Sequence, residues 1–396
     1  MGAVKICDNI YWVGVVDWDI RYFHGPAYSA HRGTTYNAFL IVDDKITLVD
    51  TVYTPFADEF IENIRQVVDP TKIDYVVVNH VEMDHSGSLP AIMELNPKAK
   101  VFCSKKGMEG LKKHYFAQWD FNVVKTGDRI SLGENTLTFI EAPMLHWPDS
   151  MFTYIAEQSL LMPNDAFGQH LASSFIFDDQ VDENILMEEA AKYYANILTP
   201  FSSLVLKKID QITKMGIDIK MIAPSHGMIW RKNAAKIINA YIEWASGRAG
   251  KKAIIVYDTM WGSTEKMARA IGRGIADQGV EYKIFKLSKS DRNDIIKEIQ
   301  DARAVVIGSP VINRGILSVL SPLLDDLKGL RPVNKVGVSF GSYGWSGGAV
   351  EAIQQGLKEA GIEVMEDGLA INWVPDGREI QACVELGNRI AQRIKE

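Results

Sequence analysis

Tyr75-Val76-Val77-Val78-Asn79 runs directly into His80-Val81-Glu82-Met83-Asp84-His85, and this stretch decides how the first half of the chain folds. Its apolar start is typical of a buried strand. Four potential metal ligands follow within six residues: His80, Glu82, Asp84 and His85. Such groups are costly to bury unless they are paired or bind a metal. The alternative is a polar loop in solvent, because short clusters of this kind also arise by accident.

Three more ligand candidates follow apolar runs further along the chain. His146 comes after residues 137–145, Asp165 comes after residues 160–164, and His226 comes shortly after Met221-Ile222. Taken singly, each is more often a loop or core residue. Because strand ends can meet at one edge of a sheet, the three together with residues 80–85 predict a metal site there.

The order of expected elements divides the chain at the small and charged residues 246–252, and we predict domains at 1–247 and 251–396. The second domain alternates strands and helices, which predicts a doubly wound parallel sheet of the α/β class. Its strands are expected at 253–257, 281–286, 304–308, 335–340 and 363–371, with helices near 264–278, 291–301, 316–328 and 347–360. The first domain is rich in strands, at 10–16, 37–42, 46–50, 75–79, 100–103, 136–141, 152–156 and 160–163, and this favours a sandwich of two sheets with outer helices.

Three loops of the second domain follow strands at positions where a parallel sheet binds ligands. Residues 259–264 combine hydroxyl side chains with a glycine at a strand-to-helix turn, which suits a phosphate held by backbone N–H groups. The loop has neither the lysine of an ATP-binding loop nor the GxGxxG of a dinucleotide site, so the pattern favours FMN. Plain turns are the alternative for any one loop. The candidate FMN-binding residues are Thr259, Met260, Trp261, Gly262, Ser263, Thr264, Ser309, Pro310, Val311, Asn313, Ser342, Tyr343, Gly344, Trp345, Ser346 and Gly347.

Composition excludes several classes of protein. The chain has 396 residues, of which 47% are hydrophobic, and its formal net charge is −7. Nucleic acids and anionic membranes require concentrated positive charge, so neither is an expected partner. No stretch approaches the roughly 18 apolar residues of a spanning helix. Three widely spaced cysteines without a CxxC pair fit a reducing compartment, and we expect a cytoplasmic location.

The ligand pattern resembles the metallo-β-lactamase motif HxHxDH with its distant His, Asp and His ligands, except that Glu82 replaces the second His. The second domain resembles flavodoxin along essentially its whole length. The combination resembles the flavodiiron protein family. It implies an αββα sandwich followed by a flavodoxin-like domain, with two irons and FMN. By position, one iron would take His80, Glu82, His146 and a bridging Asp165, and the other Asp84, Asp165, His226 and, with less support, His85.

The glutamate at position 82 favours redox chemistry over hydrolysis. Zinc hydrolases of this fold suit imidazole-rich ligation, whereas an added anionic oxygen favours iron. Three carboxylates and one bridging hydroxide would balance two ferrous ions and make the reduced cluster neutral, which a dry pocket tolerates.

The resemblance further implies reduction of oxygen to water or of nitric oxide to nitrous oxide, with electrons passing from a donor through FMN to the irons. His24, Tyr193 and Tyr194 resemble residues that donate protons or hydrogen bonds near the metals, although packing alone is an equal alternative. The expected donor is a separate rubredoxin or reduced deazaflavin, and the expected assembly is a head-to-tail homodimer or a dimer of dimers. Two alternatives stay open: a binuclear zinc hydrolase fused to a flavodoxin module, and a non-catalytic electron carrier.

Overall fold

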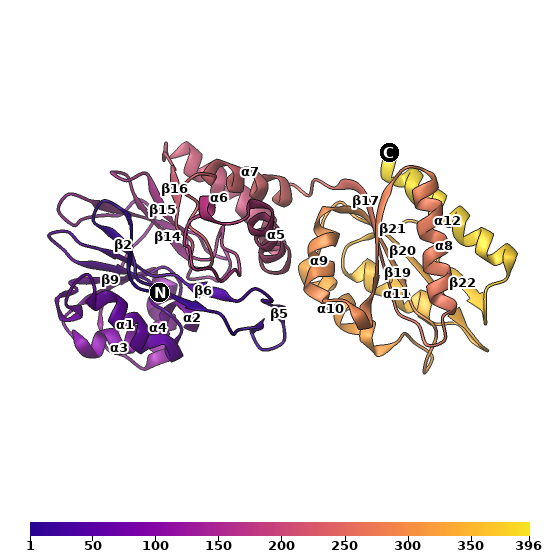
Figure 1. The fold of residues 1–396 in the computed structure, drawn as a ribbon, viewed down its shortest axis with the longest axis horizontal. Coiled ribbons are helices and arrows are strands. Elements are labelled where there is room, and N and C mark those ends of the chain that lie inside the picture. Colours follow the sequence, from indigo (N-terminus) through magenta and orange to yellow (C-terminus); the bar gives the residue numbers. More distant parts are fainter. The chain divides into compact units, whose positions relative to one another are not determined.

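The computed structural model describes all 396 residues and divides into two compact units. The first unit comprises Met1–Tyr194 and Ser203–Ile242, and the second comprises Glu243–Glu396 together with the short segment Ala195–Ser202 (Figure 1). No helix is at once long enough and apolar enough to cross a membrane.

Two β-sheets form the centre of the first unit. The larger sheet has the order β1 (Val4–Cys7), β2 (Ile10–Trp12), β7 (Phe39–Ile41), β8 (Thr47–Val49), β9 (Tyr75–Val78), β10 (Lys100–Cys103) and β11 (Asp120–Val123). The smaller sheet has the order β12 (Arg129–Ser131), β13 (Thr136–Glu141), β14 (Met151–Ile155), β15 (Leu160–Met162) and β16 (Met221–Ile222). Two small ribbons lie outside these sheets: β3 (Val15–Asp17) pairs with β6 (Thr34–Tyr36), and β4 (Tyr22–Phe23) pairs with β5 (Tyr28–Ser29).

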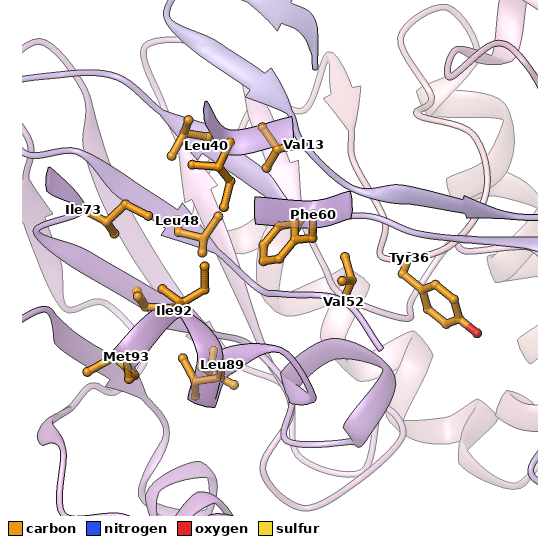
Figure 2. Packing of buried hydrophobic residues seen from close by; sticks show 14 of the residues in the cluster. Val13, Tyr36, Leu40, Leu48, Val52, Phe60, Ile73, Leu89, Ile92 and Met93 are labelled. Carbon is orange, nitrogen blue, oxygen red and sulfur yellow. The ribbon is translucent and has the colours of Figure 1, made fainter. Parts of the chain in front are cut away.

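Alternation along the strands creates two apolar layers, because neighbouring side chains of a strand point to opposite faces. Leu48 and Val76 pack with residues of the helices α1 (Ala57–Arg65), α3 (Leu89–Leu95) and α4 (Lys105–Tyr115), and Figure 2 shows this cluster around Phe60. Their neighbours Val49 and Val77 pack instead with residues of the smaller sheet. The larger sheet is therefore covered by helices on one face and by the second sheet on the other.

The remaining helices of the first unit are α2 (Met83–Ser86), α5 (Glu183–Tyr193), α6 (Ser202–Lys214) and α7 (Ala234–Ala245). Lys208 of α6 donates to the carbonyl of Glu141 in β13, and the Tyr241 hydroxyl of α7 accepts from the Phe167 N–H at 2.7 Å. These contacts attach helices to the smaller sheet. The predicted αββα sandwich is confirmed.

The second unit is a parallel sheet with helices on both faces (Figure 1). Its order is β18 (Glu281–Lys286), β17 (Gly250–Tyr257), β19 (Ala302–Gly308) and β20 (Val336–Tyr343), beside which β21 (Glu363–Val364) and β22 (Leu369–Asn372) both pair with β20. One face packs on α8 (Ser263–Asp277) and α12 (Gly377–Lys395). The other packs on α9 (Arg292–Asp301), α10 (Ser321–Leu330) and α11 (Ala349–Glu359). The predicted doubly wound sheet of the flavodoxin type is confirmed.

Two of the expected strands are each interrupted at a glycine. The strand expected at 363–371 is divided between β21 and β22, and a Cβ at Gly368 would lie 2.2 Å from the Ser339 Oγ. The strand expected at 10–16 is divided between β2 and β3, and a Cβ at Gly14 would lie 2.2 Å from the Tyr36 carbonyl oxygen. In both places another part of the chain passes too close for a side chain.

Candidate metal centre and cofactor pocket

Loops from both sheets of the sandwich bring the predicted metal ligands together. His80 and Glu82 follow β9, and Asp84 and His85 lie in the short helix α2 that comes next. The other three ligand candidates follow strands of the smaller sheet, with His146 after β13, Asp165 after β15 and His226 after β16. All seven side chains fall into two groups whose candidate ligand atoms lie within 4.8 Å of one another: His80, Glu82, His146 and Asp165 form the first group, and Asp84, His85 and His226 form the second.

The first group surrounds one carboxylate oxygen of Glu82 and one of Asp165. The Glu82 Oε2 lies 3.2 Å from the His80 Nε2 and 3.4 Å from the His146 Nε2. The Asp165 Oδ2 lies 3.6 Å and 3.4 Å from the same two nitrogens. Four donor atoms of two histidines and two carboxylates thus face a common point.

The second group surrounds the other oxygen of Asp165. The Asp165 Oδ1 lies 3.0 Å from the His85 Nε2 and 3.6 Å from the His226 Nε2. Asp84 presents Oδ1 at 3.4 Å from His85 and Oδ2 at 3.1 Å from His226. Asp165 therefore has one oxygen in each group, which is the geometry of a bridging ligand. His85, the ligand with the least support from the sequence, lies within the second group.

The electrostatics of the first group favour positive charge between its side chains. Burial lowers the pKa of His80, but Asp149 and Glu82 outweigh it and raise the pKa to about 10. Burial also lowers the pKa of His146, but Asp165 and Glu82 outweigh it and raise that pKa to about 10. Burial raises the pKa of Glu82, but His146, His24 and His80 hold that pKa well below its usual range.

Unpaired oxygens also indicate bound cations. Asp84 Oδ1 and Asp165 Oδ2 are buried and form no hydrogen bond, although imidazole nitrogens lie 3.4 Å from each. A buried carboxylate oxygen without a partner is costly, and a metal ion would remove that cost. The donor set of histidines and carboxylates, with no thiolate, fits iron in a non-haem site. The residues present therefore fit a pair of metal ions.

His24 lies against the first group. Its Nε2 lies 2.6 Å from the Glu82 Oε1, the oxygen that does not face His80 and His146. The His24 side chain is 37% exposed, so solvent reaches it. The hydrogen bond to Glu82 raises the pKa of His24. A solvent-linked imidazole in contact with a candidate ligand is well placed to move protons to the site.

The structure separates the two candidate tyrosines. The Tyr193 hydroxyl lies at the end of α5 and donates to the Asp165 Oδ1 at 3.1 Å. Tyr194 is fully buried, and its ring packs edge-on against Tyr241 with 4.9 Å between the ring centroids. Of the pair, Tyr193 is thus the one that contacts the predicted bridging carboxylate.

Sequence reasoning missed the residues that contact the Nδ1 nitrogens of two ligand candidates, His80 and His226. The Asp149 Oδ2 lies 3.0 Å from the His80 Nδ1, and the Thr35 carbonyl oxygen lies 2.6 Å from the His226 Nδ1. A carboxylate three residues after a candidate ligand, as in His146-Trp147-Pro148-Asp149, is a signal that could have identified Asp149. No pattern in the sequence points to a carbonyl. His170 was also missed, and its ring stacks on Phe23 with centroids 4.3 Å apart.

A cavity of about 640 Å³ opens where strands of the second unit end. Of the predicted flavin-binding residues, it is lined by Thr259, Met260, Trp261, Ser263, Pro310, Val311, Asn313, Ser342, Tyr343, Gly344, Trp345 and Ser346. The rim carries large exposed rings, with Trp261 94% and Trp345 91% exposed. Three loops that are distant in the sequence therefore meet around one space.

Four predicted flavin-binding residues do not line this cavity. Gly262 is the residue before α8, at φ 90°, and its N–H donates to the Thr259 hydroxyl at 3.0 Å. Thr264 is fully buried, with its hydroxyl 3.4 Å from that of Ser342. Ser309 is also fully buried, and its hydroxyl accepts from the Leu317 N–H at 3.0 Å. Gly347 lines a small adjoining pocket. Gly262, Thr264 and Ser309 therefore stabilise the loops around the cavity through hydrogen bonds.

The cavity also has lining residues that the sequence did not predict, namely Ile312, Arg314, Trp373 and Val374. Trp373 and Val374 follow β22, so a fourth strand end contributes, and the sequence signal was the loop Asn372-Trp373-Val374-Pro375-Asp376 after the last strand. Arg314 is the one charged residue of the lining.

Comparisons with known proteins agree with both halves of this description. Residues 34–227 match the family profile described as "ODP family beta lactamase", and residues 255–387 match "Flavodoxin". The chain is 62% identical to a "Nitric oxide reductase" of Moorella thermoacetica over 99% of each chain. It is 42% identical to an "Anaerobic nitric oxide reductase flavorubredoxin" of Escherichia coli, over 99% of this chain and 82% of that relative.

Solved structures give the same result. The rubredoxin oxygen:oxidoreductase of Desulfovibrio gigas superposes with a TM-score of 0.97 at 39% identity, over 99% of this chain and 98% of that one. The flavodiiron protein of Giardia intestinalis superposes with a TM-score of 0.96 at 32% identity, over 100% of this chain and 97% of that one. The chain belongs to the flavodiiron protein family. In this flavodiiron protein the family resemblance seen in the sequence is confirmed for the whole chain.

Proposed function

We propose that this flavodiiron protein is an oxidoreductase that reduces nitric oxide to nitrous oxide, oxygen to water, or both. FMN and two non-haem irons are its cofactors, and electrons pass from a donor through FMN to the diiron site. The observation that carries the proposal is Asp165, which places one oxygen in each of two carboxylate–histidine groups. Relatives named nitric oxide reductase and rubredoxin oxygen:oxidoreductase support both substrates.

The ligand roles follow from the two groups. His80, Glu82 and His146 are proposed to hold one iron, Asp84, His85 and His226 to hold the other, and Asp165 to contact both. When bound, the irons and FMN supply stored electrons: two suffice for two nitric oxides and four for one oxygen. The same cofactor set therefore serves either gas.

Two side chains are proposed to supply protons and hydrogen bonds. Burial and the Asp165 carboxylate raise the pKa of Tyr193 well above its usual range, so the phenol stays neutral and remains a donor. His24 lies at the exposed side of Glu82, where it can take protons from solvent and pass them inward. Tyr194 keeps a packing role.

The cavity of the second unit is proposed to hold FMN. The turn Thr259–Ser263 at the start of α8 offers backbone N–H groups and hydroxyls to the phosphate. Thr264 and Ser309 stabilise the loops that line the cavity through their hydrogen bonds with Ser342 and Leu317. Trp261 and Trp345 are proposed to cover the flavin ring, since exposed aromatic rings stack well on planar ligands.

The partners and assembly belong to the same proposal. The donor is rubredoxin or reduced deazaflavin, and the chains associate as a head-to-tail homodimer or a dimer of dimers in the cytoplasm. A head-to-tail arrangement would let the FMN of one chain serve the diiron site of its partner. The domain boundaries at residues 247 and 251 remain part of this proposal.

Two other functions fit less of what is observed. A binuclear zinc hydrolase uses imidazole-rich ligation, whereas Glu82 adds a carboxylate to the first group. A pure electron carrier would need no cluster of seven converging ligands.

The test is the metal and flavin content of the purified protein, followed by gas consumption with chemically reduced rubredoxin. We expect two irons and one FMN per chain, with consumption of nitric oxide, oxygen or both. His226→Asn is the matched control, because it removes a ligand of the second group without touching the flavin cavity, and it should keep FMN but lose gas consumption. Two zincs and no gas consumption, in protein expressed with iron available, would overturn the proposal.

A further inference from the structure

Three of the four histidines in the two metal groups differ in what lies against the Nδ1 nitrogen. His80 Nδ1 faces the Asp149 carboxylate at 3.0 Å, and this is the only anionic partner of the three. His226 Nδ1 faces the neutral carbonyl of Thr35 at 2.6 Å. His85 Nδ1 is buried and has no hydrogen-bond partner. The first group therefore has a negative charge directly behind an imidazole, and the second group has none there.

Asp149 is held firmly in this position. Its side chain is 5% exposed, and its Oδ2 also accepts from the Val81 N–H at 2.8 Å. Its own carbonyl accepts from the Ser104 hydroxyl at 2.7 Å. Because Asp149 lies in the loop after His146, it connects the two loops that supply the imidazoles of the first group. A carboxylate behind a metal-binding histidine fixes the tautomer and makes the ring a stronger donor.

Other charged groups around the site do not remove this difference. Asp50 is a buried carboxylate whose charge acts on His85 of the second group, but its hydrogen bonds go to Asn79 and Asn164 rather than to a ligand. His24 contacts Glu82 of the first group and opposes the negative charge there. It is 37% exposed, so solvent screens its charge more than that of buried Asp149.

We propose that Asp149 is a positioning residue that makes the first metal group more electron-rich than the second. It holds His80 with Nδ1–H directed at the carboxylate and Nε2 directed at the metal. With irons bound, this carboxylate would favour the ferric state in the group that contains His80. This inference rests on the proposed function for its irons, although the charge difference holds for any divalent pair.

The test compares Asp149→Asn with Asp178→Asn. Asparagine keeps the shape of Asp149 and an oxygen that can accept a hydrogen bond, but it loses the charge. Asp178 is equally buried, and its carboxylate accepts from the backbone N–H groups of Arg231, Lys232 and Asn233 instead of from a ligand. It therefore controls for the general effect of neutralising a buried aspartate.

The first readout is stepwise binding of Co²⁺ to metal-free protein, followed by its visible absorption. We expect Asp149→Asn to weaken one of the two binding steps by about 10–100-fold and to leave the other nearly unchanged. Asp149→Glu, which restores the charge, should recover part of the loss. Equal weakening of both steps, or the same loss in Asp178→Asn, would overturn the proposal. Because this readout needs neither iron nor gas, it is independent of the proposed function.

The second readout is a redox titration of the iron-loaded protein followed by Mössbauer spectroscopy. In the unaltered protein, we expect the half-reduced state to hold its ferric ion at one distinct site. In Asp149→Asn, the reduction potential of this ion should rise. The difference between the reduction potentials of the two steps should therefore become smaller. An unchanged gap in a variant that still binds two irons would contradict the charge effect.

Discussion

The His24 Nε2 and the Glu82 Oε1 lie 2.6 Å apart, while the other oxygen of Glu82 faces His80 and His146. One carboxylate thus connects a half-exposed imidazole to the inside of the metal group. His24 itself has a left-handed backbone, with φ 52°, in the turn between β4 and β5. This turn places the imidazole against Glu82, so the backbone of the turn fixes the position of the His24 side chain.

Replacement of His24 by Asn should slow gas reduction while leaving both cofactors in place. A positioned acid or base contributes about 10²–10⁴-fold to a rate, and solvent can replace part of that, so we expect a loss of about 10–100-fold in kcat. The measurement is steady-state consumption of nitric oxide and oxygen at matched iron and FMN content. His114→Asn, at the end of α4, is the control and should have no effect. Full activity of His24→Asn would assign His24 to packing.

Replacement of Glu82 by His should shift the site from iron toward zinc and reduce gas consumption. The variant loses one of the carboxylates that balance the charge of two irons, and it restores the imidazole-rich ligation typical of zinc hydrolases. The measurement is metal content after expression with both metals supplied, together with gas consumption. If the variant bound two irons with full activity, the charge argument for iron would be wrong.

The sequence predicted the ligands because they are chemically costly residues at the ends of apolar runs. His80, Asp165 and His226 each stood out for that reason, and the strand ends do converge. Asp149 did not stand out, because a single aspartate in a loop is ordinary until its distance to His80 is known. The contact from Thr35 could not be predicted, because it is made by a backbone carbonyl, which every residue has.

Local geometry also limited the prediction of the fold and of the cofactor pocket. Apolar runs gave the central strands, but the breaks at Gly14 and Gly368 depend on close approach of distant chain segments. The helices α2 to α6 and α12 were missed, because their apolar positions are few or are interleaved with charged residues. Trp373 was missed since its loop follows the last strand, after the three loops that resemble flavodoxin.

Replacement of Arg314 by Met should weaken binding of FMN. Arg314 is the one charged residue that lines the cavity, and FMN is an anion. Hydrogen bonds to charged groups contribute about 1.5–3 kcal/mol, so we expect the Kd to rise by about 10–100-fold. The measurement is fluorescence titration of flavin-free protein with FMN and with riboflavin. Arg314→Lys is the control and should keep most of the affinity.

The riboflavin titration locates the contact that Arg314 makes. If Arg314 binds the phosphate, only FMN binding weakens in Arg314→Met; if it binds the ring, both flavins lose affinity equally. Unchanged affinity for both flavins would contradict any role of Arg314 in binding.

Replacement of Glu298 by Gln should destabilise the second unit. The Glu298 carboxylate accepts from the Lys252 and Lys283 ammonium groups at 3.0 Å and 2.8 Å, and its side chain is only 11% exposed. Burial raises the pKa of Glu298, but Lys283 and Lys252 outweigh it and hold the pKa at about 2. Lys297 also lies 3.2 Å from this carboxylate, so the variant leaves three lysines without this partner. We expect a loss of about 2 kcal/mol in the free energy of unfolding.

The pH dependence gives a second check on Glu298. Because its pKa is lower in the folded state than the ordinary 4.5, its stabilising effect is fully present above pH 4.5 and disappears as the pH falls through about 2. The difference in stability between the protein and Glu298→Gln should therefore shrink over that interval. Thermal unfolding followed by flavin fluorescence measures it. Glu359→Gln alters an exposed pair with Lys328 and should behave like the unaltered protein. A difference that stayed constant down to pH 2 would show that lost packing, rather than charge, causes the destabilisation.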